Sequence, residues 1–161
     1  MQPLKNAAGA ELEWKSGGLL SREYALQCGG QVFATLTTGS PATAKTARES
    51  WTFERGGFLR PHVSARVAGT ETEVARVALS WGRSGILALK GGREYEWENV
   101  WFWSGKWRFI DATGKIVVRF EPCASLFKTD YGVVMEDCTH PDMSLLVTIG
   151  WYMVLLKERY R

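Results

Sequence analysis

The clearest structural signal in this chain is its C-terminal segment, Pro141-Asp-Met-Ser-Leu-Leu-Val-Thr-Ile-Gly-Trp-Tyr-Met-Val-Leu-Leu-Lys-Glu-Arg-Tyr-Arg161. It carries a strong helix pattern, and its apolar side chains fall on every face of that helix. A helix without a polar face must be surrounded by apolar material, either protein or lipid. Pro141 suits the first helical position because it lacks an N–H group, and Asp142 in the first turn favours the helix dipole. We therefore expect a helix over about 141–158.

The length of the apolar run favours protein over lipid as its surroundings. Met143–Leu156 covers about 14 residues, which at 1.5 Å per residue gives roughly 21 Å. A bilayer core of about 30 Å needs about 20 residues. Burying about ten large side chains contributes on the order of 20 kcal/mol gross. The helix is therefore predicted to be part of the folding core.

The rest of the chain carries a repeated strand pattern. Short segments of alternating apolar and polar residues are separated by turn residues such as Gly29-Gly30 and Gly91-Gly92. Regular turns of this kind predict a mainly β fold, a closed β-barrel of about twelve strands around the central C-terminal helix, in one domain over 1–161. The expected strands are Leu12–Trp14, Tyr24–Gln27, Gln31–Thr38, Ala44–Arg55, Arg60–Val67, Glu71–Trp81, Ile86–Lys90, Arg93–Glu98, Val100–Trp103, Lys106–Asp111, Lys115–Glu121 and Tyr131–Asp137.

Composition restricts the class of protein and its location. The net charge of +3 is too small to indicate nucleic-acid binding. The three cysteines, Cys28, Cys123 and Cys138, are odd in number and form no CxxC pair, which favours a reducing compartment. The first ten residues lack the apolar run of a signal peptide. We expect a cytoplasmic protein without a transmembrane span, with peripheral membrane contact left open.

Three segments resemble the tubby C-terminal-like superfamily, and most closely its LURP-one-related and scramblase-like branch. They are Trp51-Thr-Phe-Glu-Arg-Gly-Gly57, then Trp107-Arg-Phe-Ile-Asp-Ala-Thr-Gly114 with Val117-Val-Arg-Phe120, and Leu145-Leu-Val-Thr-Ile-Gly-Trp-Tyr152. The resemblance implies a closed barrel with a hydrophobic helix through its centre. It also implies association with membrane lipids or phosphoinositides, or scaffolding, and no established catalysis. The basic residues through which eukaryotic members bind phosphoinositide have no residue-by-residue counterpart in this chain.

Two groups of cations are candidates for contacting a lipid phosphate. A headgroup is a compact anion, so it needs cations that converge on one face. Lys106 and Arg108 lie two residues apart on the outward face of one expected strand. Arg60, His62 and Arg66 share the outward face of another. The alternative for both groups is a solvated barrel exterior.

Two other groups could carry hydrolytic chemistry. Glu94, Glu96 and Glu98 alternate with aromatic residues, as carboxylates at a sugar-cleaving site do, but nothing supplies an opposing acid. Cys138 and His140 precede the helix, where a thiol pKa can be lowered, but no third orienting residue is indicated. We expect no catalytic residue, metal site or cofactor.

The sequence therefore predicts a non-enzymatic binding or scaffold module. Its partner is predicted to be an anionic phospholipid headgroup or another protein, and not nucleic acid. One alternative is a small hydrolase that uses Cys138 and His140 or the three glutamates. A further alternative is a structural protein that forms oligomers through the aromatic run Trp101–Trp103.

Overall fold

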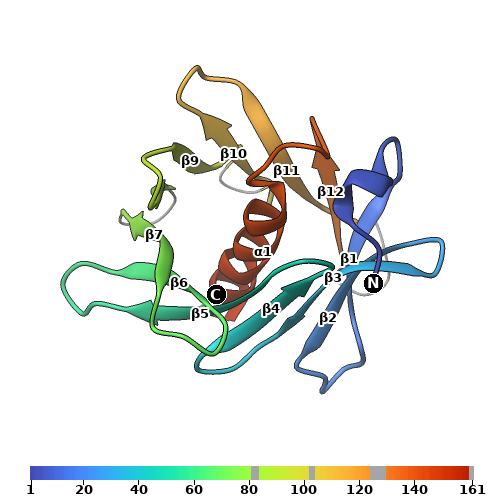
Figure 1. Ribbon diagram of the computed structural model, residues 1–161, viewed down its shortest axis with the longest axis horizontal. Helices are drawn as coiled ribbons and strands as arrows, with labels where there is room; N and C mark the ends of the chain where they lie inside the picture. Colours follow the sequence, from blue (N-terminus) through green and yellow to red (C-terminus); the bar gives the residue numbers. More distant parts are fainter. Residues whose placement is uncertain (81–83, 102–103, 124–129, 160–161) are drawn as a thin grey trace.

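The computed structural model describes residues 1–80, 84–101, 104–123 and 130–159, and of Arg159 only the backbone. A closed antiparallel barrel of twelve strands surrounds the helix α1 (Figure 1), which confirms the predicted mainly β architecture. The elements are η1 (a 3-10 turn, Leu4–Ala7), β1 (Leu12–Ser16), β2 (Glu23–Cys28), β3 (Gln31–Thr37), β4 (Ala42–Thr46), β5 (Ser50–Gly56), β6 (His62–Val67), β7 (Glu73–Leu79), β8 (Ser84–Leu89), β9 (Glu94–Asn99), β10 (Trp107–Asp111), β11 (Ile116–Pro122), β12 (Tyr131–Met135) and α1 (Met143–Arg159).

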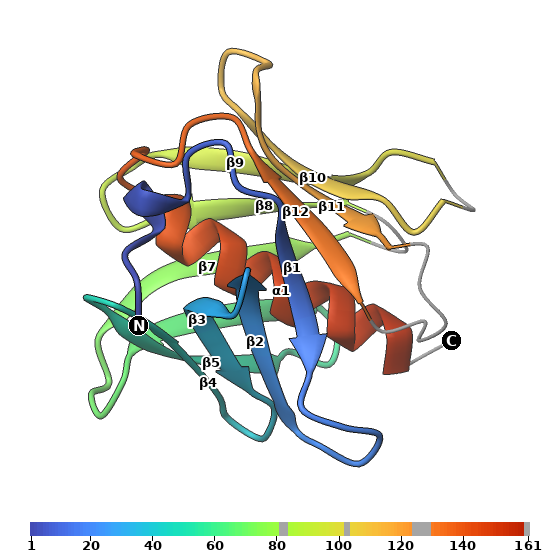
Figure 2. The same cartoon turned by 90° about the vertical axis from the view of Figure 1, so that its right-hand side faces the viewer.

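The strands follow one another around the barrel in sequence order, and β12 closes it against β1. Connections in such a meander alternate between the two ends. The loops 17–22, 38–41 and 57–61 lie at one end, with the described parts of the connections after β7, β9 and β11. We call this the exit end, because the last turns of α1 lie there (Figure 2). The loops 29–30, 47–49, 68–72, 90–93, 112–115 and 136–142 form the entry end.

The barrel interior encloses α1 on all sides. Leu146, Val147 and Ile149 have no exposed surface. Trp151 stacks on Trp14 of β1, with the ring centroids 5.7 Å apart. The described helix falls short of the length and apolarity that a membrane-crossing helix needs. Protein side chains therefore surround the apolar run.

The predicted start of the helix is wrong by two residues. α1 begins at Met143, because Pro141 and Asp142 belong to a turn in which Met143 N donates to His140 O at 3.0 Å. The carbonyl oxygen of Asp142 accepts from Leu146 N at 2.9 Å. Asp142 is therefore the N-cap residue of α1. Its carboxylate is hydrogen-bonded to Arg93 and Tyr95, outside the helix.

The total of twelve strands agrees with expectation although two individual strands were mispredicted. Ala44–Arg55 is not one strand but β4 and β5, because Thr46 and Glu49 close a turn in which Thr46 Oγ1 accepts from Glu49 N at 3.2 Å. Val100 and Trp101 lie in a connection instead of a strand, since Val100 N donates to Lys106 O at 2.9 Å and closes a loop. Trp81, Phe102 and Trp103, also expected in strands, lie outside the described residues.

Candidate functional site

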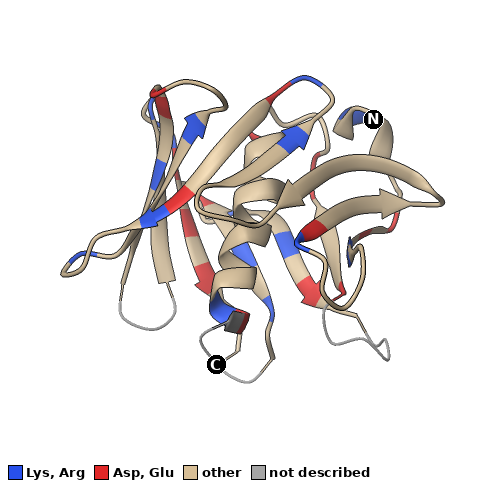
Figure 3. Cartoon of the chain, turned by 90° about the horizontal axis from the view of Figure 1, so that it is seen from below, with Lys and Arg blue, Asp and Glu red and all other residues tan. Residues whose placement is uncertain are grey.

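Two of the five predicted cations are paired on the barrel wall. Arg108 of β10 is hydrogen-bonded through its guanidinium to Glu98 of β9. Arg66 of β6 lies 3.6 Å from a carboxylate oxygen of Glu54 on β5. Basic and acidic residues are interspersed over the strands (Figure 3). The described wall therefore has no continuous basic face that could bind a headgroup.

The other predicted cations lie at the exit end, on separate loops of its rim. Arg60 lies in the loop 57–61 and Lys106 in the connection after β9, and both are exposed. Arg22, in the loop 17–22, joins them. None of the three has an ion pair with a described carboxylate. His62 begins β6 beside this loop, with its Nδ1 3.3 Å from Arg60 O. The structure thus brings Arg60 and Lys106 to one end and leaves Arg66 and Arg108 on the wall.

The same loops carry the most exposed large apolar side chains of the described chain. Their exposed fractions are 94% for Leu19, 98% for Leu20, 100% for Phe58, 83% for Leu59 and 71% for Trp101. Other exposed apolar side chains reach at most 56%. These side chains lie on alternate loops around one rim of the barrel, after β1, β5 and β9. Scattered exposed apolar residues are ordinary on a soluble protein, but five on three loop tips of the same end indicate an interaction surface.

Two of these loops share a sequence pattern that the strand-based prediction passed over. Gly17-Gly-Leu-Leu-Ser-Arg22 and Gly56-Gly-Phe-Leu-Arg60 both place an apolar pair after two glycines and before an arginine. Gly57 has φ +80°, and a Cβ there would lie 2.0 Å from Arg60 O, so the loop requires glycine at this position. The glycines turn the chain sharply, and the apolar pair has no strand or core to pack against. A Gly-Gly pair followed by large apolar residues is the signal that could have identified these tips.

The two ends of the barrel differ in charge and polarity. The described residues of the exit-end connections contain one acid, Asp130, and three cations, Arg22, Arg60 and Lys106. The entry-end connections mix both signs and carry no exposed large apolar side chain. Their charged residues are Arg48, Glu49, Glu71, Lys90, Arg93, Lys115, Glu136, Asp137 and Asp142. Exposed apolar loop tips that occur together with cations are therefore a property of the exit end.

An ion-pair cluster around the buried carboxylate of Asp142 holds the start of α1 at the entry end. Arg93 donates to both carboxylate oxygens of Asp142 at 2.7 Å, and Tyr95 Oη donates to the same carboxylate at 2.6 Å. Burial alone would raise the pKa of Asp142, but the hydrogen bonds from Arg93 and Tyr95 and the guanidinium charge outweigh it and lower the pKa. Burial and the hydrogen bond to Asp142 raise the pKa of Tyr95. This cluster fastens the helix to β9.

The side chains considered for hydrolysis are engaged separately. His140 Nδ1 accepts from Asp142 N at 3.1 Å, and its Nε2 lies 3.4 Å from Tyr95 Oη. Cys138 Sγ donates to Lys5 O at 3.5 Å, and no hydrogen bond between described atoms joins it to His140.

The predicted glutamate strand is likewise one-sided. Glu94 and Glu96 are exposed on β9, and Glu98 on the same face is bound to Arg108. No group of three or more His, Cys, Asp or Glu among the described residues is placed to hold a metal ion. The described geometry therefore does not join Cys138 to His140, and it pairs one of the three glutamates with Arg108.

Comparisons with protein-family models, with curated proteins and with solved structures find no match to this chain. The barrel and the central helix implied by the tubby-like resemblance are present, while membership of that superfamily stays a prediction.

Proposed function

We propose that this protein is a non-enzymatic module that binds the surface of anionic phospholipid membranes through its exit end. The observation that carries the proposal is the set of five exposed apolar side chains at that end, Leu19, Leu20, Phe58, Leu59 and Trp101. In this arrangement the tips enter the boundary between headgroups and acyl chains while the cations behind them contact phosphate. The three free cysteines support a cytoplasmic location, peripheral to the membrane.

The free energies of apolar burial and of charge attraction indicate which of the two contributes more to membrane binding. Full burial of a Leu or Phe side chain contributes about 1.5–3 kcal/mol, and each Lys or Arg near an anionic surface contributes about 1 kcal/mol. Five apolar tips therefore outweigh the cations Arg22, Arg60 and Lys106. Binding should depend mainly on the tips, and the cations should add a preference for anionic lipid that salt screens.

Vesicle co-sedimentation with matched variants tests this proposal. Leu20→Ser with Phe58→Ser should reduce partitioning onto phosphatidylserine-containing vesicles by about tenfold or more. Both side chains are almost fully exposed, so the fold should not change. The control is Ile86→Ser with Val67→Ser, which removes exposed apolar side chains of the strands β8 and β6 instead of the exit-end loops and should bind like the parent.

A second pair of variants isolates the charge contribution. Arg60→Glu with Lys106→Glu should weaken binding to anionic vesicles at low salt and have little effect on vesicles of phosphatidylcholine alone. Lys90→Glu with Lys115→Glu makes the same charge change at the entry end and should have little effect. The proposal fails if the parent does not sediment with vesicles, or if the apolar variant sediments as well as the parent. It also fails if light scattering shows that the tips hold two copies of the chain together.

A further inference from the structure

The edge of β12 is only partly covered by β1. The β1–β12 pairing ends at Leu12 opposite Val133, whereas β12 continues to pair with β11 as far as Met135. Glu136 N donates to Val117 O on the β11 side. Because successive residues of a strand direct their backbone groups to opposite neighbours, the N–H and C=O of Met135 face the β1 side. No described residue hydrogen-bonds with them there.

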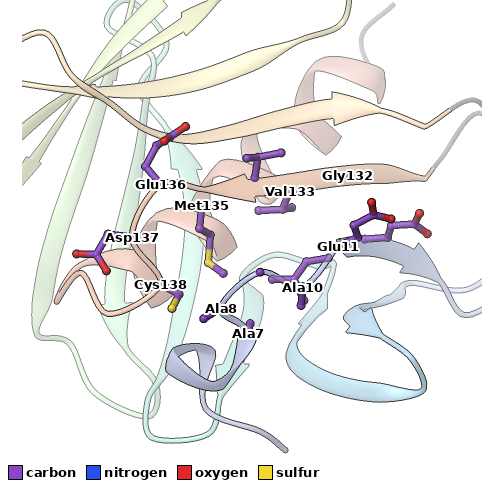
Figure 4. A pocket seen from close by; sticks show the side chains of 14 residues that line it. Ala7, Ala8, Ala10, Glu11, Gly132, Val133, Met135, Glu136, Asp137 and Cys138 are labelled. Carbon is purple, nitrogen blue, oxygen red and sulfur yellow. The ribbon is translucent and has the colours of Figure 1, made fainter.

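A groove lies along this uncovered edge. Upstream of Leu12 the segment Ala7–Glu11 runs apart from β12 and leaves a groove of about 680 Å³ between them. Met135 and Cys138 point into the groove toward Ala8 and Ala10 (Figure 4). The side chains on one side of the groove are small, and the backbone of Met135 on the other side is unpaired. Another peptide backbone therefore has room to approach closely.

The charge of the groove is opposite to that of the whole protein. Its lining contains four carboxylates, Glu11, Glu13, Glu136 and Asp137, and no Lys or Arg, whereas the chain has a net charge of +3. Glu11 lies toward one end of the groove, and Glu136 and Asp137 toward the other (Figure 4).

The cations near these carboxylates are few and exposed. Hydrogen bonds from Thr139 lower the pKa of Asp137, so this carboxylate stays ionised. Glu13 lies beside the Cys123 thiol, and burial and the Glu13 carboxylate raise the pKa of that thiol. The cations that pair with Glu13 and Glu136 are exposed: Lys15 at 3.4 Å and Arg119 at 3.6 Å. Exposed pairs of this kind are weak.

We propose that this groove binds a short, extended peptide segment of a partner protein, with small apolar residues in its middle and Lys or Arg toward its ends. The segment adds as a strand to the β12 edge and hydrogen-bonds to the N–H and C=O of Met135. Main-chain pairing supplies affinity in this mode of recognition, and side chains supply specificity. The acidic ends of the groove select the basic residues.

This inference goes beyond membrane binding and does not depend on it. The groove lies where β12 ends, toward the entry end, so the exit-end loops point away from it. Failure of either proposal leaves the other standing.

A defined probe peptide tests the inference in the full chain. The probe is a fluorescein-labelled short peptide with lysines at both ends and alternating valine and alanine between them, titrated by fluorescence polarisation. Glu11→Lys with Glu136→Lys should weaken its binding about tenfold or more. The same change at exposed sites outside the groove, Glu71→Lys with Glu94→Lys, is the control and should be close to the parent. Ala8→Trp should block the groove without touching the core, since Ala8 is exposed.

Amide hydrogen exchange separates strand addition from simple charge attraction. Exchange at the Met135 amide should slow when the probe peptide is bound. A peptide of the same charge, N-methylated along its backbone, should neither bind as tightly nor protect Met135. The inference is overturned if the probe does not bind, if the groove variants bind it like the parent, or if Met135 exchanges at the same rate with and without the probe.

Discussion

At the scale of single residues, Asp142 shows how one carboxylate fixes the helix inside the barrel. It is 6% exposed and receives hydrogen bonds from Arg93 and Tyr95. We expect Asp142→Asn to lower the free energy of unfolding by about 2 kcal/mol near neutral pH, because both donors lose their charged acceptor. Urea unfolding of the variant beside Glu71→Gln, an exposed control, measures this effect.

The same carboxylate predicts how stability depends on pH. The folded protein lowers the pKa of Asp142 below its ordinary value of 3.8. A lowered pKa contributes stability above the ordinary pKa, and that stability is lost as the pH falls through the folded value. The parent should therefore lose stability steeply below about pH 4, and Asp142→Asn less steeply. Asp111 and Asp137 also have lowered pKa values and keep some acid sensitivity in the variant. Identical slopes for parent and variant would contradict this role of Asp142.

Gly150 is the residue whose size permits close packing of α1. A Cβ at this position would lie 2.4 Å from Cζ of Phe120 and 3.1 Å from Cε2 of Phe109, and both rings are fully buried. Alanine gains about 1 kcal/mol in helix propensity over glycine, but overpacking costs about 1–3 kcal/mol. Gly150→Ala should therefore destabilise the protein in thermal unfolding, and Phe120→Leu in the same chain should recover part of the loss. A Gly150→Ala variant more stable than the parent would contradict the packing described.

At the scale of elements, α1 is the centre of the folding core. Its buried side chains fill the interior of the barrel and pack with the inward-facing side chains of the strands. Without α1 the barrel would have to close around an empty cavity, which close-packed protein interiors do not contain. Deleting Pro141–Arg161 should give insoluble or molten protein, detected by loss of near-ultraviolet circular dichroism and by dye binding. A soluble truncation that melts cooperatively would show that the strands fold without the helix.

How far the sequence predicts the elements depends on whether their signals are local. The helix is predictable because every face of it is apolar. The sequence does not predict the turn between β4 and β5, because Thr46-Ala-Arg-Glu49 contains neither Gly nor Pro and its signal is a single threonine hydroxyl. The aromatic and β-branched residues at Val100 and Trp101 favour a strand, yet a backbone hydrogen bond from Val100 to Lys106 closes a loop there.

At the scale of the whole molecule, the candidate site depends on strand register, which a single sequence does not reveal. Alternation correctly predicts that Arg108 and Arg66 face outward. Only the register places Glu98 beside Arg108 and Glu54 beside Arg66. The placement of Arg60 and Lys106 at the same end likewise follows from the alternation of loops around a closed barrel. To predict the apolar tips from the sequence, the Gly-Gly pattern must be combined with this barrel topology.

Paramagnetic broadening from the bilayer itself gives the most direct test of membrane binding through the exit end. Nuclear magnetic resonance spectra of the full chain would be recorded with lipid nanodiscs that contain phosphatidylserine and a gadolinium-bearing lipid. We expect the amide signals of Leu20, Phe58 and Trp101 to broaden strongly, while those of Thr70 and Thr113 at the entry end stay sharp. Equal broadening at both ends, or broadening confined to the entry end, would contradict the orientation and with it the proposed function.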